Sequence, residues 1–311
     1  MSLVVVGSMA LDSIETPFEN HDDVWGGSAT YFSTAASYFT RVELVAVVGN
    51  DFPEEVVSFL EGRGVDLAGL TRTDGPTFRW KGRYAYNMED RETLDTQLGV
   101  FEHFDPELPD GYRDAELVFL ANIDPDLQRK VLGQVKKPRL VACDTMNFWI
   151  EGKLEALKKT LASVDLLIIN DGEARQLAGE HNIVRAAKAI REMGPERLIV
   201  KRGEYGAMLF DGDHVFVAPA FPLFDVIDPT GAGDSFAGGL MGYLAGVDEV
   251  NQTTLRQAMI AGSALASFTC EGFGLDRLRK VENGQIKERI AAFRALTHFE
   301  ELGDAALSTV A

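Results

Sequence analysis

Residues 228–239, with the sequence DPTGAGDSFAGG, combine a turn, closely spaced glycines and two carboxylates. Gly231 and Gly233 permit backbone angles that other residues avoid, and the hydrophobic spacing after Asp234 predicts a helix that extends to Gly246. The unpaired N–H groups of a first helical turn attract anions, and Asp234 in that turn can act as a base. The run therefore predicts a phosphate site beside a carboxylate. The alternative is an ordinary helix start with an acidic first-turn residue.

The predicted helix carries Gly238, Gly239 and Gly242 in its interior. Each glycine there costs roughly 1 kcal/mol relative to alanine. A segment that breaks local rules so densely is typical of a place where another backbone must approach closely. We interpret these glycines as support for a functional loop and helix.

Polar residues stand at or just after the ends of several short apolar runs that read as strands. They are Asp12, Asn122, Asp144, Asn170 and Lys201. The carboxyl ends of parallel strands meet at one edge of a sheet, so these residues predict a cleft along that edge.

Two of these strand ends carry additional signals. Asn170 and Glu173 offer amide and carboxylate oxygens that suit Mg²⁺ held through water, although the same pair also fits a helix capping box. Residues 201–206 (KRGEYG) place two cations and two glycines after a strand. That turn could hold a nucleotide phosphate, or it could be an ordinary charged turn.

Strands alternate with helices along most of the chain, which predicts an α/β fold with a central, mainly parallel sheet and helices on both faces. Short connections predict a single domain over residues 1–311. Residues 72–104 differ, because basic residues cluster there and bulky and polar residues alternate. This pattern predicts a small inserted β-sheet, with residues 13–24 as a further candidate part of it. It could be a lid, a homodimer surface or both.

Composition limits the possible partners. The chain has 311 residues, 46% of them hydrophobic, and a net charge of −18. Such a surface repels nucleic acid and anionic membranes. The two cysteines and five histidines show no metal-ligand spacing, and no apolar run reaches the roughly 18 residues that span a bilayer. We expect a soluble, cytoplasmic protein with reduced thiols that binds neither nucleic acid nor membranes.

Familiar nucleotide and hydrolase motifs are absent from the sequence. A dinucleotide-binding G-x-G-x-x-G would need a third glycine where Phe236 stands. No strand-linked G-x-x-x-x-G-K-[ST] occurs, and no serine elbow has a matching histidine signature.

Taken together, the motifs resemble the ribokinase-like PfkB carbohydrate kinases. Residues 228–236 resemble the C-terminal signature of that family, and Gly26-Gly27 with the following helix resemble its N-terminal signature. The other strand-end residues fall in the family's order and rough spacing. The resemblance covers nearly the whole chain.

The resemblance implies ATP-dependent transfer of a phosphoryl group to a hydroxyl of a sugar or sugar-like molecule. Asp234 would be the general base, and the N–H groups of Gly231, Ala232 and Gly233 would form the anion hole for the γ-phosphoryl. Glu173 would help to hold Mg²⁺ through water. A monovalent cation such as K⁺ would sit near Asp228.

The resemblance also implies two groups of binding residues. Those expected to line ATP are Asn170, Lys201, Gly203, Gly206 and Thr230. Those expected around the acceptor are Asp12, Gly26, Gly27, Tyr31 and Asn147.

Departures from the family pattern concentrate on the acceptor side. Tyr31 stands where the family often has asparagine, and the usual Asp-Pro-Asn reads Asp144-Thr145-Met146-Asn147. The acceptor therefore stays open, and a nucleoside or cyclitol kinase of the same family is the alternative. Tyr31, Phe148 and Trp149 could form an aromatic pocket, or they could be ordinary core residues. A non-catalytic ligand-binding homologue is a further alternative.

Overall fold

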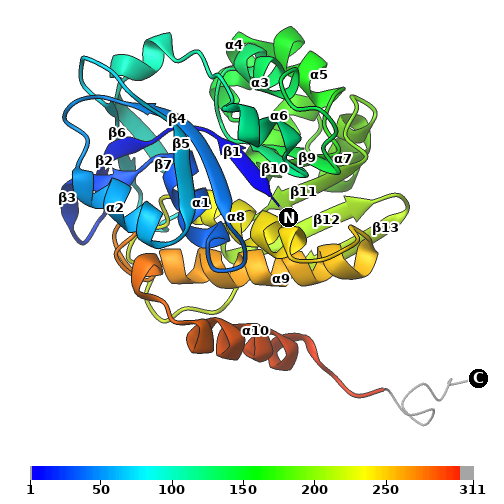
Figure 1. The fold of residues 1–311 in the computed structure, drawn as a ribbon. Coiled ribbons are helices and arrows are strands. Elements are labelled where there is room, and N and C mark those ends of the chain that lie inside the picture. The colour runs from blue at the N-terminus through cyan, green and yellow to red at the C-terminus, as the bar shows by residue number, and fades with distance from the viewer. Residues whose placement is uncertain (1, 302–311) are drawn as a thin grey trace, which may run out of the picture.

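The computed structural model describes residues 2–301, and a large β-sheet runs through its centre (Figure 1). Its nine strands, in spatial order, are β13 (His214–Ala218), β12 (Ala207–Asp211), β11 (Arg197–Lys201), β10 (Leu166–Asn170), β9 (Leu140–Cys143), β8 (Leu117–Leu120), β1 (Leu3–Val6), β4 (Val42–Val48) and β5 (Val65–Arg72). The strands from β11 to β5 are parallel, and β12 and β13 form an antiparallel hairpin at one edge. This confirms the predicted fold class.

Helices cover both faces of this sheet. One face carries α1 (Ser28–Ala36), α2 (Glu54–Gly62), α8 (Ala232–Ala245) and α9 (Gln252–Thr269). The other carries α3 (Pro125–Leu132), α5 (Leu154–Leu161), α6 (Asp171–Ala178) and α7 (Ile183–Arg191). The short α4 (Asn147–Gly152) precedes α5, and α10 (Asn283–Thr297) lies outside α9 (Figure 1). Strand β1, buried on both faces, contributes alternate side chains to the two cores.

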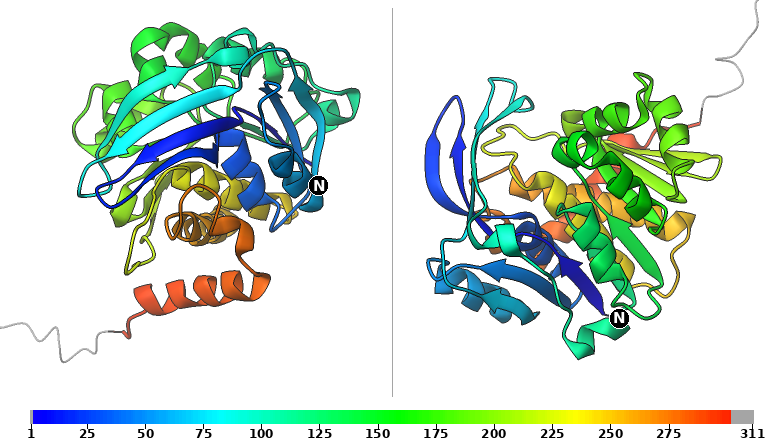
Figure 2. Two further views of the ribbon diagram at one scale, coloured as in Figure 1. Left: turned by 90° about the vertical axis from the view of Figure 1, so that its left-hand side faces the viewer. Right: turned by 90° about the horizontal axis from the view of Figure 1, so that it is seen from above.

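A second sheet of four strands stands beside the carboxyl end of β1 (Figure 2). Its order is β3 (Asn20–Gly26), β2 (Ala10–Glu15), β6 (Phe78–Tyr84) and β7 (Arg91–Gln97). Half of this small sheet comes from residues 10–26, because β2 pairs with β6, and this half includes the candidate segment 13–24. Asp12 lies within β2 rather than at or just after the end of a strand, which corrects the sequence analysis.

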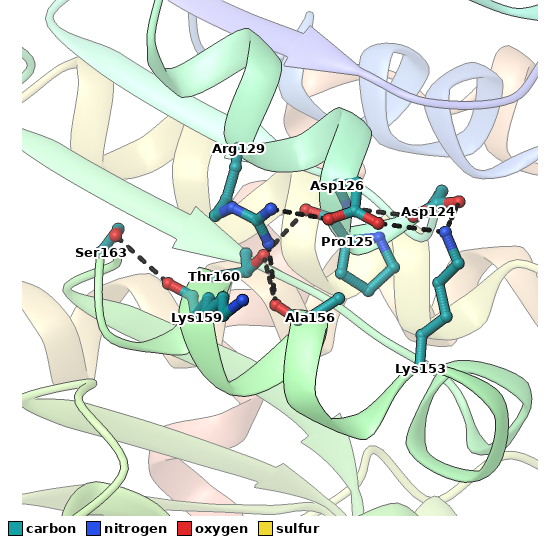
Figure 3. Close-up of polar contacts among 9 residues, drawn as sticks. All are labelled: Asp124, Pro125, Asp126, Arg129, Lys153, Ala156, Lys159, Thr160 and Ser163. Atoms are coloured by element: carbon teal, nitrogen blue, oxygen red, sulfur yellow. Dashed lines mark hydrogen bonds and ion pairs between the residues drawn. The ribbon is translucent and has the colours of Figure 1, made fainter.

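Polar contacts fix α3 against α5 (Figure 3). The guanidinium of Arg129 donates to the carbonyl oxygen of Ala156 at 3.1 Å. The ammonium of Lys153 bonds to Asp124 at 2.7 Å and to Asp126 at 3.1 Å. These charged residues therefore join two helices on the outer face of the core.

None of the helices within residues 2–301 is both long enough and apolar enough to span a membrane. Both cysteines of the chain are free thiols.

The glycines in the interior of α8 serve helix packing. A Cβ atom at Gly238 would overlap the carbonyl oxygen of Phe32 in α1, and one at Gly242 would lie 2.9 Å from Ala36 Cα. A Cβ at Gly239 would lie 3.0 Å from the Cα of Gly262 in α9. The prediction of close backbone approach is confirmed. Its interpretation as part of a phosphate loop is wrong for these three residues, because the approaching backbones belong to α1 and α9.

Gly238→Ala should lower the free energy of unfolding by about 1–3 kcal/mol, because the added methyl group overpacks the contact between α1 and α8. Gly62→Ala is the matched control, since no atom lies within 4 Å of a Cβ at that position. It should be neutral or stabilise by up to about 1 kcal/mol. Urea denaturation measures both changes. Equal effects of the two substitutions would contradict the packing role of Gly238.

Candidate active site

Helix α8 begins with exposed backbone donors and no side-chain cap. Its N-cap residue is Gly231, in the left-handed conformation with φ 74°, and this residue supplies no side-chain cap. The N–H of Ala232 donates to the carbonyl oxygen of Pro229 at 3.1 Å. By contrast, α6 and α9 both begin with side-chain caps. The absence of a side-chain cap and the helix dipole make the start of α8 a suitable place for an anion.

Asp228 and Tyr31 fix the loop before α8. Asp228 is fully buried, and its carboxylate accepts hydrogen bonds from the backbone N–H groups of Thr230 at 2.8 Å and Gly274 at 3.0 Å. The ring of Tyr31 packs under Gly231 so closely that a Cβ atom there would overlap it. A glycine at position 231 is therefore required both by its backbone angles and by its neighbour.

Asp234 lies in the first turn of α8 among other charged groups. Burial and the nearby Asp144 raise the pKa of Asp234 to about 7, while Lys201 and Arg91 oppose this shift. A carboxyl group with a pKa near 7 is suited to accept and release a proton at neutral pH.

Lys201 brings positive charge to the same place from the end of β11. A Cβ atom at Gly233 would lie 2.8 Å from its ammonium nitrogen, and that nitrogen lies 3.7 Å from Asp144 Oδ2. Burial alone would lower the pKa of Lys201, but Asp144, Glu173 and Asp234 together raise it above its ordinary value. Lys201 is thus a cation held beside the start of α8.

Asp12 lies on β2 of the small sheet, whereas Lys201 lies on β11 of the large sheet. Its carboxylate fills the space next to Gly26, where a Cβ atom would overlap it. Burial raises the pKa of Asp12 to about 8, with the N–H of Gly27 opposing and Asp228 and Asp234 adding to the shift. Trp80 is the register partner of Asp12 on β6, so the indole and the carboxylate share one face of the small sheet.

The Asn170–Glu173 pair forms a capping box at the start of α6. Glu173 Oε2 accepts the N–H of Asn170, and Asn170 Oδ1 accepts the N–H of Glu173, both at 2.8 Å. Burial and then Asp144 raise the pKa of Glu173 to about 7. Within residues 2–301 no group of three or more acidic, histidine or cysteine side chains could enclose a metal ion. The oxygen donors here fit Mg²⁺ that is bound chiefly by phosphates and water.

The small sheet contacts both ends of the site. The buried hydroxyl of Tyr84 accepts a hydrogen bond from Thr230 Oγ1 at 3.1 Å. In the turn after β6, Glu89 Oε1 accepts the N–H of Glu204 at 3.3 Å, next to Gly203. Gly203 and Gly206 both have positive φ, 49° and 84°. The small sheet therefore touches both the loop before α8 and the turn after β11.

Sequence reasoning and structure differ in detail at the site. Asp234 interacts electrostatically with both Asp12 and Lys201, and the ammonium of Lys201 lies beside Gly233 at the start of α8. Asn147 is exposed, and no contact among residues 2–301 joins it to the others, so its role toward the acceptor stays a prediction. Tyr31 is buried and packs against Gly231. This agrees with the alternative that Tyr31 is an ordinary core residue.

Sequence reasoning assigned no role to three residues that reach the site from the small sheet: Trp80, Tyr84 and Arg91. The only sequence signals for these three residues are the basic cluster of residues 72–104 and its alternation of bulky and polar residues. Phe148 is exposed and Trp149 donates to Asn122, so neither packs against the loop before α8 through a recorded contact.

Comparisons with known proteins identify the family and the fold. Residues 3–279 match the model of the pfkB family of carbohydrate kinases, and the chain belongs to that family. It is therefore a phosphotransferase with an alcohol group as acceptor.

Among its relatives is a cytidine kinase of Thermococcus kodakarensis, 28% identical over 253 residues, which cover 79% of this chain and 90% of that protein. The nucleoside kinase of Methanocaldococcus jannaschii has a similar structure, with a TM-score of 0.74, 21% identity and coverage of 94% and 98% of the two chains. The ribokinase of Arabidopsis thaliana complexed with ribose and ATP has a TM-score of 0.74, 21% identity and coverage of 93% and 98%. These structural likenesses establish the ribokinase fold.

The raised pKa of Asp234 predicts a pH dependence. Below about pH 7 the carboxyl group is protonated and cannot accept a proton, so kcat/KM should fall about tenfold per pH unit on that side. Lys201→Met should move this acid limb to higher pH, because Lys201 lowers the pKa of Asp234. Lys158→Met, which removes a surface lysine paired with Glu155, should leave the limb in place. A profile that is flat between about pH 6 and 8 would show that no such group controls the reaction.

Proposed function

We propose that this protein transfers the γ-phosphoryl group of ATP to a hydroxyl of a sugar or a sugar-bearing small molecule, with Asp234 as the general base. The observation that carries the proposal is the placement of Asp234 in the first turn of α8, beside uncapped N–H groups and Lys201. This combines a base, an anion site and a cation within one small region. Phosphoryl transfer requires mainly positioning and charge stabilisation of this kind.

The proposed transfer of the γ-phosphoryl group makes one bond to phosphorus and breaks one. The acceptor oxygen forms a bond to the γ-phosphorus, the bond to the bridging oxygen of ADP breaks, and ADP leaves with that electron pair. The hydroxyl proton passes to Asp234. The N–H groups of Gly231, Ala232 and Gly233 would stabilise the charge on the transferring group.

We assign ATP to the side of Asn170, Lys201 and the 201–206 turn, and the acceptor to the side of Asp12, Gly26 and Gly27. Mg²⁺ would neutralise charge on the ATP phosphates, with Glu173 holding its water ligands. The loop around Asp228 gives no separate support for K⁺, because both carboxylate oxygens accept backbone N–H groups.

Several expectations stay with the proposal. The small sheet would act as a lid within a single domain, because it contacts both ends of the site. A homodimer through the same sheet and a cytoplasmic location are predictions that rest on the sequence.

A nucleoside acceptor is a second candidate, favoured by Trp80. The indole lies on the same face of the small sheet as Asp12, where it could stack on a nucleobase while Asp12 binds ribose hydroxyls. A cytidine kinase among the relatives is consistent with this candidate.

Transfer of label from [γ-³²P]ATP to ribose, cytidine and myo-inositol tests the function and separates these candidates. Asp234→Asn should reduce kcat on the best acceptor by about 10²–10⁴-fold, because the amide cannot take the hydroxyl proton. Calorimetry should show ATP binding unchanged within about threefold. Near-normal turnover of this variant would exclude Asp234 as the base, and ATP binding without transfer to any acceptor of a broad panel would favour the non-catalytic alternative.

A further inference from the structure

Most basic side chains of the small sheet form ion pairs with nearby carboxylates. Arg79 pairs with Asp51 at 3.1 Å. Lys81 and Arg83 both pair with Glu15, at 2.9 and 2.7 Å. The pairs with Glu15 join β6 to β2, and the Arg79–Asp51 pair joins the small sheet to the segment after β4 of the large sheet. One basic residue of the small sheet is an exception.

The exception is Arg91, the first residue of β7. Among residues 2–301 no ion pair is recorded for its guanidinium, which hydrogen-bonds to the side chain of Tyr84 and lies 5.3 Å from the centroid of the Trp80 ring. The residue is exposed. Because both of these contacts are with neutral side chains, the positive charge of Arg91 is available to an external anion.

The strand register directs Arg91 toward the site. Arg91 is the pairing partner of Tyr84, so the two side chains lie on the same face of the small sheet. Tyr84 on that face bonds to Thr230 of the loop before α8. The backbone of Arg91 is thus fixed beside the contact that joins the small sheet to the predicted anion hole.

The charge of Arg91 reaches residues along the whole site. It lowers the pKa values of Asp12 on the acceptor side, Asp234 at the centre and Glu173 on the metal side. The hydrogen bond of Arg91 to Tyr84, whose hydroxyl also accepts a hydrogen bond from Thr230, places the guanidinium beside the loop before α8. This loop is where the phosphoryl group would pass from ATP to the acceptor.

We propose that Arg91 binds the γ-phosphoryl group during its transfer, as a second cation opposite Lys201, with the Trp80 ring supporting the guanidinium. This inference rests on the proposed kinase function. A planar guanidinium with two parallel N–H donors matches the equatorial oxygens of a transferring phosphoryl group. Because Arg91 is on the small sheet and Lys201 on the large one, the full positive field forms only when the two sheets are together.

The test compares Arg91→Ala and Arg91→Lys with the control Arg83→Ala, which removes an ion-paired arginine of the same sheet. The assay is label transfer from [γ-³²P]ATP to the acceptor on which the wild-type protein is most active. Arg91→Ala should lower kcat by about 10²-fold with KM for ATP changed less than about threefold, and Arg91→Lys should recover part of the loss. Arg83→Ala should stay within about threefold of wild type. Millimolar guanidinium chloride should restore activity to Arg91→Ala but not to Arg83→Ala or to the wild type.

Three results would overturn the proposal. They are a kcat for Arg91→Ala equal to that of Arg83→Ala, a loss that guanidinium does not restore, and a change confined to KM for the acceptor. The last would place Arg91 on the acceptor and not on the phosphoryl group. A wild-type protein that transfers label to no acceptor would refute the kinase function itself and this inference with it, whereas normal wild-type turnover with an unaffected Arg91→Ala would refute the inference alone.

Discussion

The buried carboxylate of Asp228 holds the loop on which the proposed chemistry depends. Its two hydrogen bonds, to the N–H groups of Thr230 and Gly274, join the start of α8 to the segment after α9. Burial raises the pKa of Asp228, and those same donors oppose the shift. With the loop fixed in this way, Gly231 packs on the ring of Tyr31, and α8 begins without a side-chain cap.

Charge at the site is balanced between elements that are distant in the sequence. Asp12, Asp144, Glu173 and Asp234 would repel one another, and burial makes their ionisation more costly. Lys201 offsets part of this from the large sheet. The small sheet adds Arg91 and touches the loop through Tyr84. In a protein with a net charge of −18, an anionic substrate can be bound only because these few cations are concentrated at one place.

The sequence allowed the fold class and the centre of the site to be predicted, because buried parallel strands and the 228–239 run have strong local patterns. Residues 13–24 could be named only as a candidate part of the small sheet, since β2 pairs with β6 across some seventy residues of chain and leaves no local pattern. The glycines of α8 were recognised as places of close approach, but the approaching helices were not identifiable. Arg91 differs from its basic neighbours in having no recorded ion pair among residues 2–301, and pairing is a property of the folded chain.

The central claim is that the loop anchored by Asp228 binds the γ-phosphoryl group, and calorimetry of ADP and a non-hydrolysable ATP analogue, each with Mg²⁺, tests it directly. In Asp228→Asn the amide group would face a backbone donor, so the loop should lose its geometry. The account predicts that the preference for the triphosphate over ADP falls by roughly tenfold or more in Asp228→Asn, while Asp225→Asn, at an exposed position of the same segment, keeps it. An undiminished preference in Asp228→Asn would contradict the account.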